Sequence, residues 1–172
     1  MRILQLHCDS IEYNPTKKEI QSAEEITPEP KKLEEVVVAF VAVEEEDDLS
    51  VAKKAISEIK DSMNKIGCKK LLLYPYAHLS SKLASPTVAL SVLKEMESLS
   101  SDLDVSRAPF GWTKSYQVKV KGHPLAENFK VITKDDSQEK TSEALKSESK
   151  IKSFWYILSP DGSMTDVSEF NF

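Results

Sequence analysis

A lysine that follows an aromatic run is the side chain best placed for chemistry in this sequence. Lys114 comes directly after residues 108–113, APFGWT. An ammonium held beside an aromatic wall loses part of its hydration, which makes it more able to exchange a proton or to orient a water molecule. Glu127 follows soon after, where it could pair with Lys114 or receive a substrate amine. The residues alone equally allow a solvated strand lysine and a glutamate that is only a surface charge.

A histidine loop is the second candidate. Residues 74–81 read YPYAHLSS, in which prolines and small residues expose backbone amides and carbonyls. His78 adds a group that donates or accepts according to its protonation, next to several hydroxyls. Both candidate segments come at predicted strand ends, where α/β proteins usually keep their sites. The same residues also suit a loop that leads to a helix and packs its aromatic side chains.

Several kinds of chemistry lack support. The sequence has no GxSxG, GxxxxGK[ST], GxGxxG or HExxH motif, and its four glycines offer little for a phosphate cradle. His7, His78 and His123 are far apart, so a metal site would require the fold to bring them together. Cys8 and Cys68 show no CxxC spacing and are expected to be reduced thiols. We expect neither a metal nor a cofactor.

Composition favours one α/β domain with a tail. The chain has 172 residues, of which 40% are hydrophobic and 30% charged. No apolar run approaches the roughly 20 residues that span a bilayer, and the start carries no cleavage pattern, so we expect a cytoplasmic protein without membrane contact. The net charge is −5, but residues 1–60 carry −6 and residues 106–152 carry +4. Any RNA contact should therefore lie in the second half, although a random split of surface charge fits equally well.

Strands and a helix precede the histidine loop. Residues 2–7 suit a short strand, followed by a long irregular excursion. Residues 36–43 are nearly continuous and β-branched, which is typical of a central strand buried on both faces. Residues 51–66 repeat apolar side chains at helical spacing until Gly67. With a buried strand over residues 70–74, these elements predict a strand-helix-strand crossover.

A second helix and two more strands position the lysine. Ser85 and Pro86 form a helix start, with a hydroxyl cap and a proline in the first helical position. Residues 104–110 and 115–121 are two strand candidates around Gly111, and the second alternates so that one face is exposed to water. The predicted buried stripe of the helix consists of Val88, Val92, Met96 and Leu99.

The end of the chain differs from the rest. Residues 133–152 are rich in Lys, Asp, Ser and Glu and predict a polar linker. Residues 153–172 predict a hairpin, with an aromatic strand, the turn Ser159-Pro160-Asp161-Gly162 and a return strand. An isolated hairpin is marginal in water. We therefore expect either the start of a following domain or a strand pair that docks on the main body.

Five segments, taken in order, resemble one known family. They are LQLHCDSIEY, EEVVVAFVAVE, YPYAHLSS, APFGWTK and KGHPLAE, and they are similar to the amino-terminal editing domain of archaeal threonyl-tRNA synthetases over about residues 1–132. FWYILSPDG resembles the join to the next domain of that synthetase. The resemblance implies an α/β fold like that of D-aminoacyl-tRNA deacylases, with one mixed sheet and two main helices. It also implies a homodimer and a synthetase catalytic domain in the same or a separate chain.

The activity that the resemblance implies is hydrolysis of tRNA(Thr) carrying serine at its 3′ end. Serine lacks one methyl group of threonine, and a synthetic pocket gains only about 1–3 kcal/mol from that methyl. A second pocket that is too tight for the methyl can remove the error. The terminal ribose hydroxyl of the tRNA is expected to assist, so the protein needs no nucleophile.

The resemblance also implies roles for particular residues. Lys114 would orient the attacking water, His78 would contact the terminal adenosine, and Glu127 would help to hold the substrate and the lysine. Backbone groups near Val43 and Ala77 would bound the amino-acid side chain. The implied substrate-binding residues are Val43, Tyr74, Pro75, Ala77 and Phe110, and the implied catalytic ones are Lys114, His78, Glu127 and Thr113.

One position departs from the family. Next to the lysine the family usually has tyrosine, whereas this chain has Thr113. A threonine hydroxyl is shorter and cannot stack on a base, so it would act through a bridging water, or activity would be lower. We expect Lys114 to matter more than Thr113. Three other functions remain open: a D-aminoacyl-tRNA deacylase, a non-catalytic module for tRNA binding or dimerisation, and a small metal-binding domain.

Overall fold

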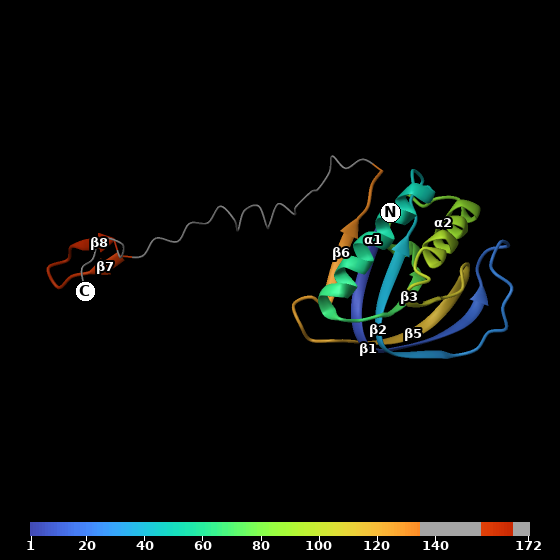
Figure 1. Cartoon of the computed structure of the whole chain (residues 1–172), viewed down its shortest axis with the longest axis horizontal. Helices are drawn as coiled ribbons and strands as arrows, with labels where there is room; N and C mark the ends of the chain where they lie inside the picture. The colour runs from blue at the N-terminus through green and yellow to red at the C-terminus, as the bar shows by residue number, and fades with distance from the viewer. Residues whose placement is uncertain (135–155, 167–172) are drawn as a thin grey trace. The chain divides into compact units, whose positions relative to one another are not determined.

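The computed structural model describes residues 1–134 and 156–166. It divides into two units, Met1–Asp135 and Asp136–Phe172 (Figure 1). Of the predicted linker, residues 135–152 lie outside the described residues. No helix in the described ranges is long and apolar enough to cross a membrane.

The first unit is built on one mixed sheet. Its strand order is β4-β3-β2-β1-β5, and β6 also pairs with β1. The strands β2, β3 and β4 are parallel to one another, whereas β1 runs antiparallel to β2, β5 and β6. The mixed α/β class predicted from the sequence is confirmed. The bounds are β1 Arg2–Lys18, β2 Lys31–Ala42, β3 Lys70–Pro75, β4 Asp104–Arg107, β5 Trp112–Val120 and β6 Glu127–Val131.

The first strand is much longer than predicted. β1 runs to Lys18, so the expectation of an irregular chain directly after residue 7 was wrong; the irregular part is residues 19–30. Register shifts occur between Cys8 and Ser10 and near Pro15. The last pair between β1 and β2 is Tyr13 with Lys31, so the missing N–H of Pro15 breaks no bond of that ladder. The shifts let β1 curve, as Figure 1 shows.

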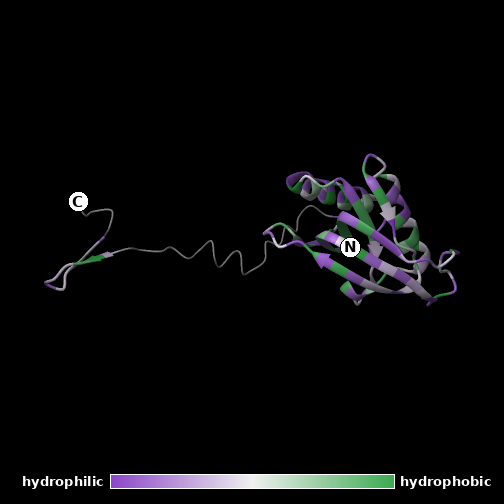
Figure 2. Ribbon diagram, turned by 90° about the horizontal axis from the view of Figure 1, so that it is seen from below, coloured by the Kyte–Doolittle hydropathy of each residue, from purple (hydrophilic) through white to green (hydrophobic). Residues whose placement is uncertain are grey.

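The central strand β2 is buried on both faces, as predicted. Val37, Ala39 and Val41 belong to the core cluster that includes the two helices, whereas Val38 and Phe40 belong to a second cluster on the opposite face. Neither α1 nor α2 contributes a residue to that second cluster. The curved half of β1 covers it instead, because the ring of Tyr13 lies 5.7 Å from that of Tyr74 in an edge-to-face contact. Figure 2 shows the alternating hydrophilic and hydrophobic bands along the strands.

The two predicted helices are present and lie on the same face of the sheet (Figure 1). Helix α1, Leu49–Ile66, begins after Asp48, whose carboxylate accepts from the Ser50 amide, and ends at Gly67 with φ +70°. It connects the parallel strands β2 and β3, which confirms the crossover.

Helix α2, Pro86–Ser98, begins where the sequence predicted, with Pro86 in the first turn, but the predicted hydroxyl cap is wrong, because the Ser85 side chain makes no capping hydrogen bond. Its buried face is turned relative to the predicted stripe. Val88 is exposed and Leu99 is only partly buried, because the side chains that face the core repeat at i, i+3, i+4 and i+7. The buried residues are Ala89, Val92, Leu93 and Met96.

The strands on either side of Gly111 do not form a hairpin with each other. β4 pairs with β3 and β5 pairs with β1, so the two lie at opposite edges of the sheet. Residues 108–111 therefore cross from one edge to the other, with Ala108 fully buried in the second core cluster. Along β5 the more exposed residues alternate with partly buried ones, in agreement with the predicted exposed face.

The second unit contains a small antiparallel hairpin. β7, Tyr156–Leu158, pairs with β8, Met164–Asp166. The turn is closed by the Ser163 carbonyl, which accepts from the Ser159 amide at 2.9 Å, and Gly162 adopts φ +85°. The predicted hairpin is confirmed over these residues. Residues 153–155 and 167–172 of the prediction lie outside the described residues.

Candidate functional site

A cavity of about 450 Å³ opens between the ends of β2 and β3, the first turns of α2, and the start of β5. This volume is typical of sites for small ligands. The cavity brings together the histidine loop and the lysine segment, which are far apart in the sequence. The predicted site residues that line it are Val43, Tyr74, Pro75, Ala77, His78, Phe110, Thr113 and Lys114.

Lys114 supplies the cavity with an amino group of unusual acidity. Its Nζ donates to the carbonyl oxygens of Trp112 at 2.8 Å and Pro109 at 3.0 Å, and lies 5.0 Å from the centre of the Tyr74 ring. Burial lowers the pKa of Lys114 from 10.5 to about 8, and the charge of Glu24 opposes that shift. The predicted partial loss of hydration is therefore present, but the ring beside the amine belongs to Tyr74 of β3 and not to the aromatic run that precedes Lys114 in the sequence. Such an amine exchanges protons near neutral pH.

Residues 109–112, called here the wall that holds Lys114, are held in place by Glu24 and Arg107, which were not among the predicted site residues. The Glu24 carboxylate accepts from the Phe110 amide at 2.8 Å, and its backbone carbonyl accepts from the Trp112 indole at 2.8 Å. Arg107 donates to both oxygens of this carboxylate at 2.6 and 2.8 Å. Glu24 lies in a polar segment without periodicity, so only the use of arginine rather than lysine at a strand end offered a signal.

His78 lies at the mouth of the cavity. It belongs to the short helix η1, Ala77–Leu79, directly after β3, and its side chain is exposed. Its ring lies 5.2 Å from that of Tyr76, edge to face. The backbone before it is fixed, because the Tyr76 amide donates to the Val41 carbonyl at 2.8 Å. A side chain placed in this way is free to contact a ligand.

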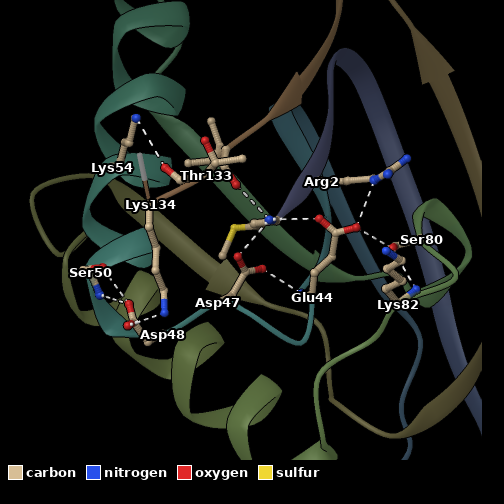
Figure 3. A network of polar contacts seen from close by, with 12 residues as sticks. Arg2, Glu44, Asp47, Asp48, Ser50, Lys54, Ser80, Lys82, Thr133 and Lys134 are labelled. Atoms are coloured by element: carbon tan, nitrogen blue, oxygen red, sulfur yellow. Dashed lines mark hydrogen bonds and ion pairs between the residues drawn. The ribbon is translucent and has the colours of Figure 1, made fainter. Parts of the chain in front are cut away.

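Glu44, directly after Val43, connects the chain beyond β2 to the loop after η1, and Figure 3 shows its contacts with Arg2 and Ser80. One of its carboxylate oxygens accepts from the Ser80 hydroxyl at 2.5 Å and from Arg2 at 3.0 Å. The other lies 3.1 Å from the backbone nitrogen of Met1. The Ala84 amide also donates to the Val43 carbonyl at 3.0 Å. The end of the cavity that Val43 and Ala77 line is therefore rigidly held.

Thr113 points to a carboxylate at the edge of the cavity. Its hydroxyl donates to Glu19 at 2.7 Å, and its carbonyl accepts from the Thr16 hydroxyl at 3.0 Å. The hydrogen bond from Thr113, with the charge of Lys17, lowers the pKa of Glu19. Glu19 is the only acidic side chain among the described residues that line the cavity. Glu19 was not among the predicted site residues.

Two tyrosines were also missed. Tyr76 and Tyr116 line the cavity, and their hydroxyl oxygens lie 3.4 Å apart. Their rings continue the buried cluster of Phe40 and Tyr74, with Phe40 5.0 Å from Tyr76 and 5.8 Å from Tyr116. Alternation along β5 gave the only signal for Tyr116.

Glu127 does not join the other predicted residues. It lies in β6 opposite Leu6, whereas Lys114 lies in β5 opposite Pro15, and the register shift after Cys8 separates these two parts of β1. Glu127 is exposed and does not line the cavity. The expected pairing of Glu127 with Lys114 is therefore wrong within one chain, because β5 and β6 follow each other along the same edge of β1.

Two of the three histidines come together, away from this cavity. The Nδ1 of His7 lies 2.8 Å from the Nε2 of His123, and the Nδ1 of His123 accepts from the Leu125 amide at 3.3 Å. His78 is not with them. Within the described ranges, no three His, Cys, Asp or Glu side chains are grouped as metal ligands would be. Both cysteines are free thiols; Cys8 is buried, which raises its pKa to about 11.

The fold is shared with a solved structure of a different sequence. The structure of c-Myc DNA Unwinding Element Binding Protein superimposes with a TM-score of 0.56 and covers 76% of this chain and 98% of its own. The two sequences are only 10% identical, so this similarity concerns the fold alone.

Sequence relatives are much closer. The threonine–tRNA ligase of Nitrosopumilus maritimus is 68% identical over the whole chain, and those of Cenarchaeum symbiosum and Thermococcus sibiricus are 60% and 41% identical. The chain spans only 28–29% of the length of these relatives. The model of the archaea-specific editing domain of threonyl-tRNA synthetase matches residues 1–132. The chain therefore belongs to the family of archaea-specific editing domains of threonyl-tRNA synthetase.

Proposed function

We propose that this chain hydrolyses the ester bond of seryl-tRNA(Thr), releasing L-serine and free tRNA. The observation that carries the proposal is the Lys114 amino group, whose pKa is lowered to about 8 in a cavity large enough for an aminoacylated nucleoside. As a neutral amine, Lys114 donates both of its hydrogens to the carbonyls of Pro109 and Trp112. Its lone pair is then free to accept a proton from water.

Water attack then proceeds without a protein nucleophile. As the water oxygen bonds to the ester carbon, Lys114 takes up the water proton. The ester bond to the terminal ribose breaks, and the proton passes to the ribose oxygen, with the neighbouring ribose hydroxyl assisting. Water is consumed, and serine and tRNA are formed. General base action of this kind contributes about 10²–10⁴-fold in rate.

Selection against threonine would come from the rigid end of the cavity. Val43 and Ala77 line it, Val43 directly after β2 and Ala77 two residues after the end of β3, and the loops that carry them are joined by the contact between Glu44 and Ser80. Closely packed walls do not yield to an extra methyl group without cost. His78 and the adjacent Tyr76 would contact the terminal adenosine at the cavity mouth.

The experiment that tests this proposal is release of amino acids from tRNA(Thr) charged with L-serine or with D-amino acids. We expect release of L-serine at a rate well above that without protein, and slow release of the D-forms. Faster release of D-amino acids would make the chain a D-aminoacyl-tRNA deacylase instead. Binding of a non-hydrolysable seryl-adenosine analogue without turnover would indicate a non-catalytic module.

A homodimer is part of the proposal. Among the described residues β6 pairs with β1 alone, and Leu125, Phe129 and Val131 on or beside it are 57%, 54% and 52% exposed. Apolar side chains at an open strand edge favour association. Light scattering after gel filtration tests this expectation, and a mass of one chain at micromolar concentration would contradict it. The synthetase catalytic domain would be a further partner, in the same or a separate chain.

A further inference from the structure

The cavity wall that holds Lys114 depends on one carboxylate that lies outside the cavity. Glu24 is separated from Arg107 by 83 positions in the sequence, yet the two form a two-point ion pair, with side chains only 19% and 10% exposed. Arg107 also donates from Nε to Glu97 of α2 at 2.9 Å. A two-point ion pair that is largely shielded from water holds its two side chains in a fixed relative position better than an exposed ion pair does.

The same carboxylate reaches the backbone of the wall. Its Oε2 accepts from the Phe110 amide, and the Glu24 amide in turn donates to the Phe110 carbonyl at 3.2 Å. The Trp112 indole donates to the Glu24 carbonyl. Residues 110–112 are thus held at three points by a single residue of the segment between β1 and β2.

These held residues present the acceptors of Lys114. The carbonyls that accept hydrogen bonds from its Nζ belong to Pro109 and Trp112, which lie on either side of Phe110 and Gly111. A change at Glu24 would therefore move the acceptors, and the amine with them. Glu24 itself does not line the large cavity; it lines a smaller one of about 150 Å³, together with Arg107 and Pro109. Its influence on the amine is exerted through the wall and through its charge.

A separate observation shows how closely the two segments meet. A Cβ atom on Gly111 would lie 2.7 Å from the Cα of Ala23 and 2.9 Å from a side-chain carbon of Ile20. The Gly111 carbonyl also accepts from the Glu19 amide at 2.9 Å. Residues 19–24 therefore lie against the wall along its length.

We propose that Glu24, paired with Arg107, is a positioning residue for the deacylation reaction, because it fixes residues 109–112 and so the direction in which Lys114 presents its amino group. The proposal rests on the proposed function of the cavity. It assigns a reaction role to the segment between β1 and β2, which carries none of the residues implied by the family resemblance.

The test compares Glu24→Gln and Glu24→Ala in the full chain. Glu24→Ala removes every side-chain contact, and a misplacement of about 1 Å costs on the order of 10²-fold in rate, so we expect kcat to fall by that factor with little change in KM. Glu24→Gln keeps the shape but removes the charge that favours the Lys114 ammonium. We expect the Lys114 pKa, and the midpoint of the pH–rate profile with it, to move down in this variant.

The pKa of Lys114 is measured directly by an NMR titration of the protein labelled with carbon-13 at the lysine ε-carbons. The signal of Lys114 is assigned as the one that is missing in Lys114→Met. The matched control is Glu58→Gln, because Glu58 also pairs with a lysine, Lys130 of β6, and neither residue lines the cavity. This control should leave kcat and the Lys114 pKa unchanged. Arg107→Lys keeps the charge and loses the two-point geometry, so it should lower kcat in the same direction.

An unchanged kcat and an unchanged Lys114 pKa in Glu24→Gln and Arg107→Lys would overturn the proposal, as would equal effects in Glu58→Gln. If Glu24→Ala fails to fold, as judged by circular dichroism, these two variants decide. If the unchanged chain releases no serine, the proposed function fails. The NMR measurement then still shows separately whether Glu24 controls the state of Lys114.

Discussion

The amino nitrogen of Lys114 lies 5.0 Å from the centre of the Tyr74 ring, and Tyr74 is only 2% exposed. The ring attracts a cation, but it does not replace the water that burial removes. The pKa of Lys114 therefore falls to about 8. An amine at the floor of the cavity that changes charge near neutral pH is the basis for the predictions that follow.

Lys114→Met should lower the rate of serine release at least about 10²-fold while it stabilises the fold. Methionine fills similar volume without a charge that must lose its hydration, so we expect the free energy of unfolding near pH 7 to rise by on the order of 1 kcal/mol, after allowance for solvent at the cavity mouth. Deacylation assays and urea unfolding measure the two effects. A variant that is less stable and fully active would contradict both the assignment and its physical reason.

The pH dependence follows from the same group. Below its pKa of about 8 the amine is mostly protonated and cannot accept a proton. The rate of the chain without substitutions, divided by the rate of Lys114→Met, should therefore rise about tenfold per pH unit and level off above pH 8. Taking the ratio removes the intrinsic hydrolysis of the ester by hydroxide. A ratio that falls as the pH rises through 8 would mean that the ammonium, and not the amine, is the working form.

The sequence predicted the helices and strands around the site, but not the long-range contacts that hold them together. The β-branched run of β2, the periodicity of α1 and the Ser85-Pro86 start of α2 are local patterns, and each was confirmed. His78, just after β3, and Lys114, near the start of β5, both line one cavity, as their positions at predicted strand ends suggested. The Glu24–Arg107 pair joins positions 83 apart, and Glu24 lies in a segment without periodicity, so no local pattern connects the two residues.

The curvature of the sheet explains the two main errors. The chain after residue 7 was expected to be irregular, but Pro15 falls where β1 has already left β2, and it breaks no bond of the ladder between these two strands. Glu127 follows Lys114 closely in the sequence, yet β5 and β6 occupy successive parts of the same edge of β1. Local patterns contain no information about which part of a long, bent strand a later strand will join.

Thr113→Val should have a small effect. The hydroxyl donates to Glu19 at the exposed edge of the cavity and not to Lys114, so removal should change the deacylation rate by no more than about threefold and stability by about 0.5 kcal/mol. The comparison with Lys114→Met, under identical assay conditions, is the measurement. Equal losses in the two variants would show that Thr113 carries a role in the chemistry itself.

Gly111→Ala should destabilise the chain by about 1–3 kcal/mol. Gly111 has φ +78°, and an added Cβ would lie 2.7 Å from Ala23. Gly67→Ala is the matched control, since Gly67 has φ +70° and nothing within 4 Å of an added Cβ, so it reports the backbone strain alone. Urea unfolding should show the larger loss at Gly111. Equal losses would mean that residues 19–24 do not lie as close to the wall as described.

The central claim is that the cavity removes serine, and not threonine, from tRNA(Thr). The most direct measurement is the deacylation of Ser-tRNA(Thr) and Thr-tRNA(Thr), side by side, with the unchanged chain. A single methyl group at a closely packed wall is worth about 1–3 kcal/mol, so we expect serine to be released roughly 10–200 times faster. Release of both amino acids at the same rate would contradict the account.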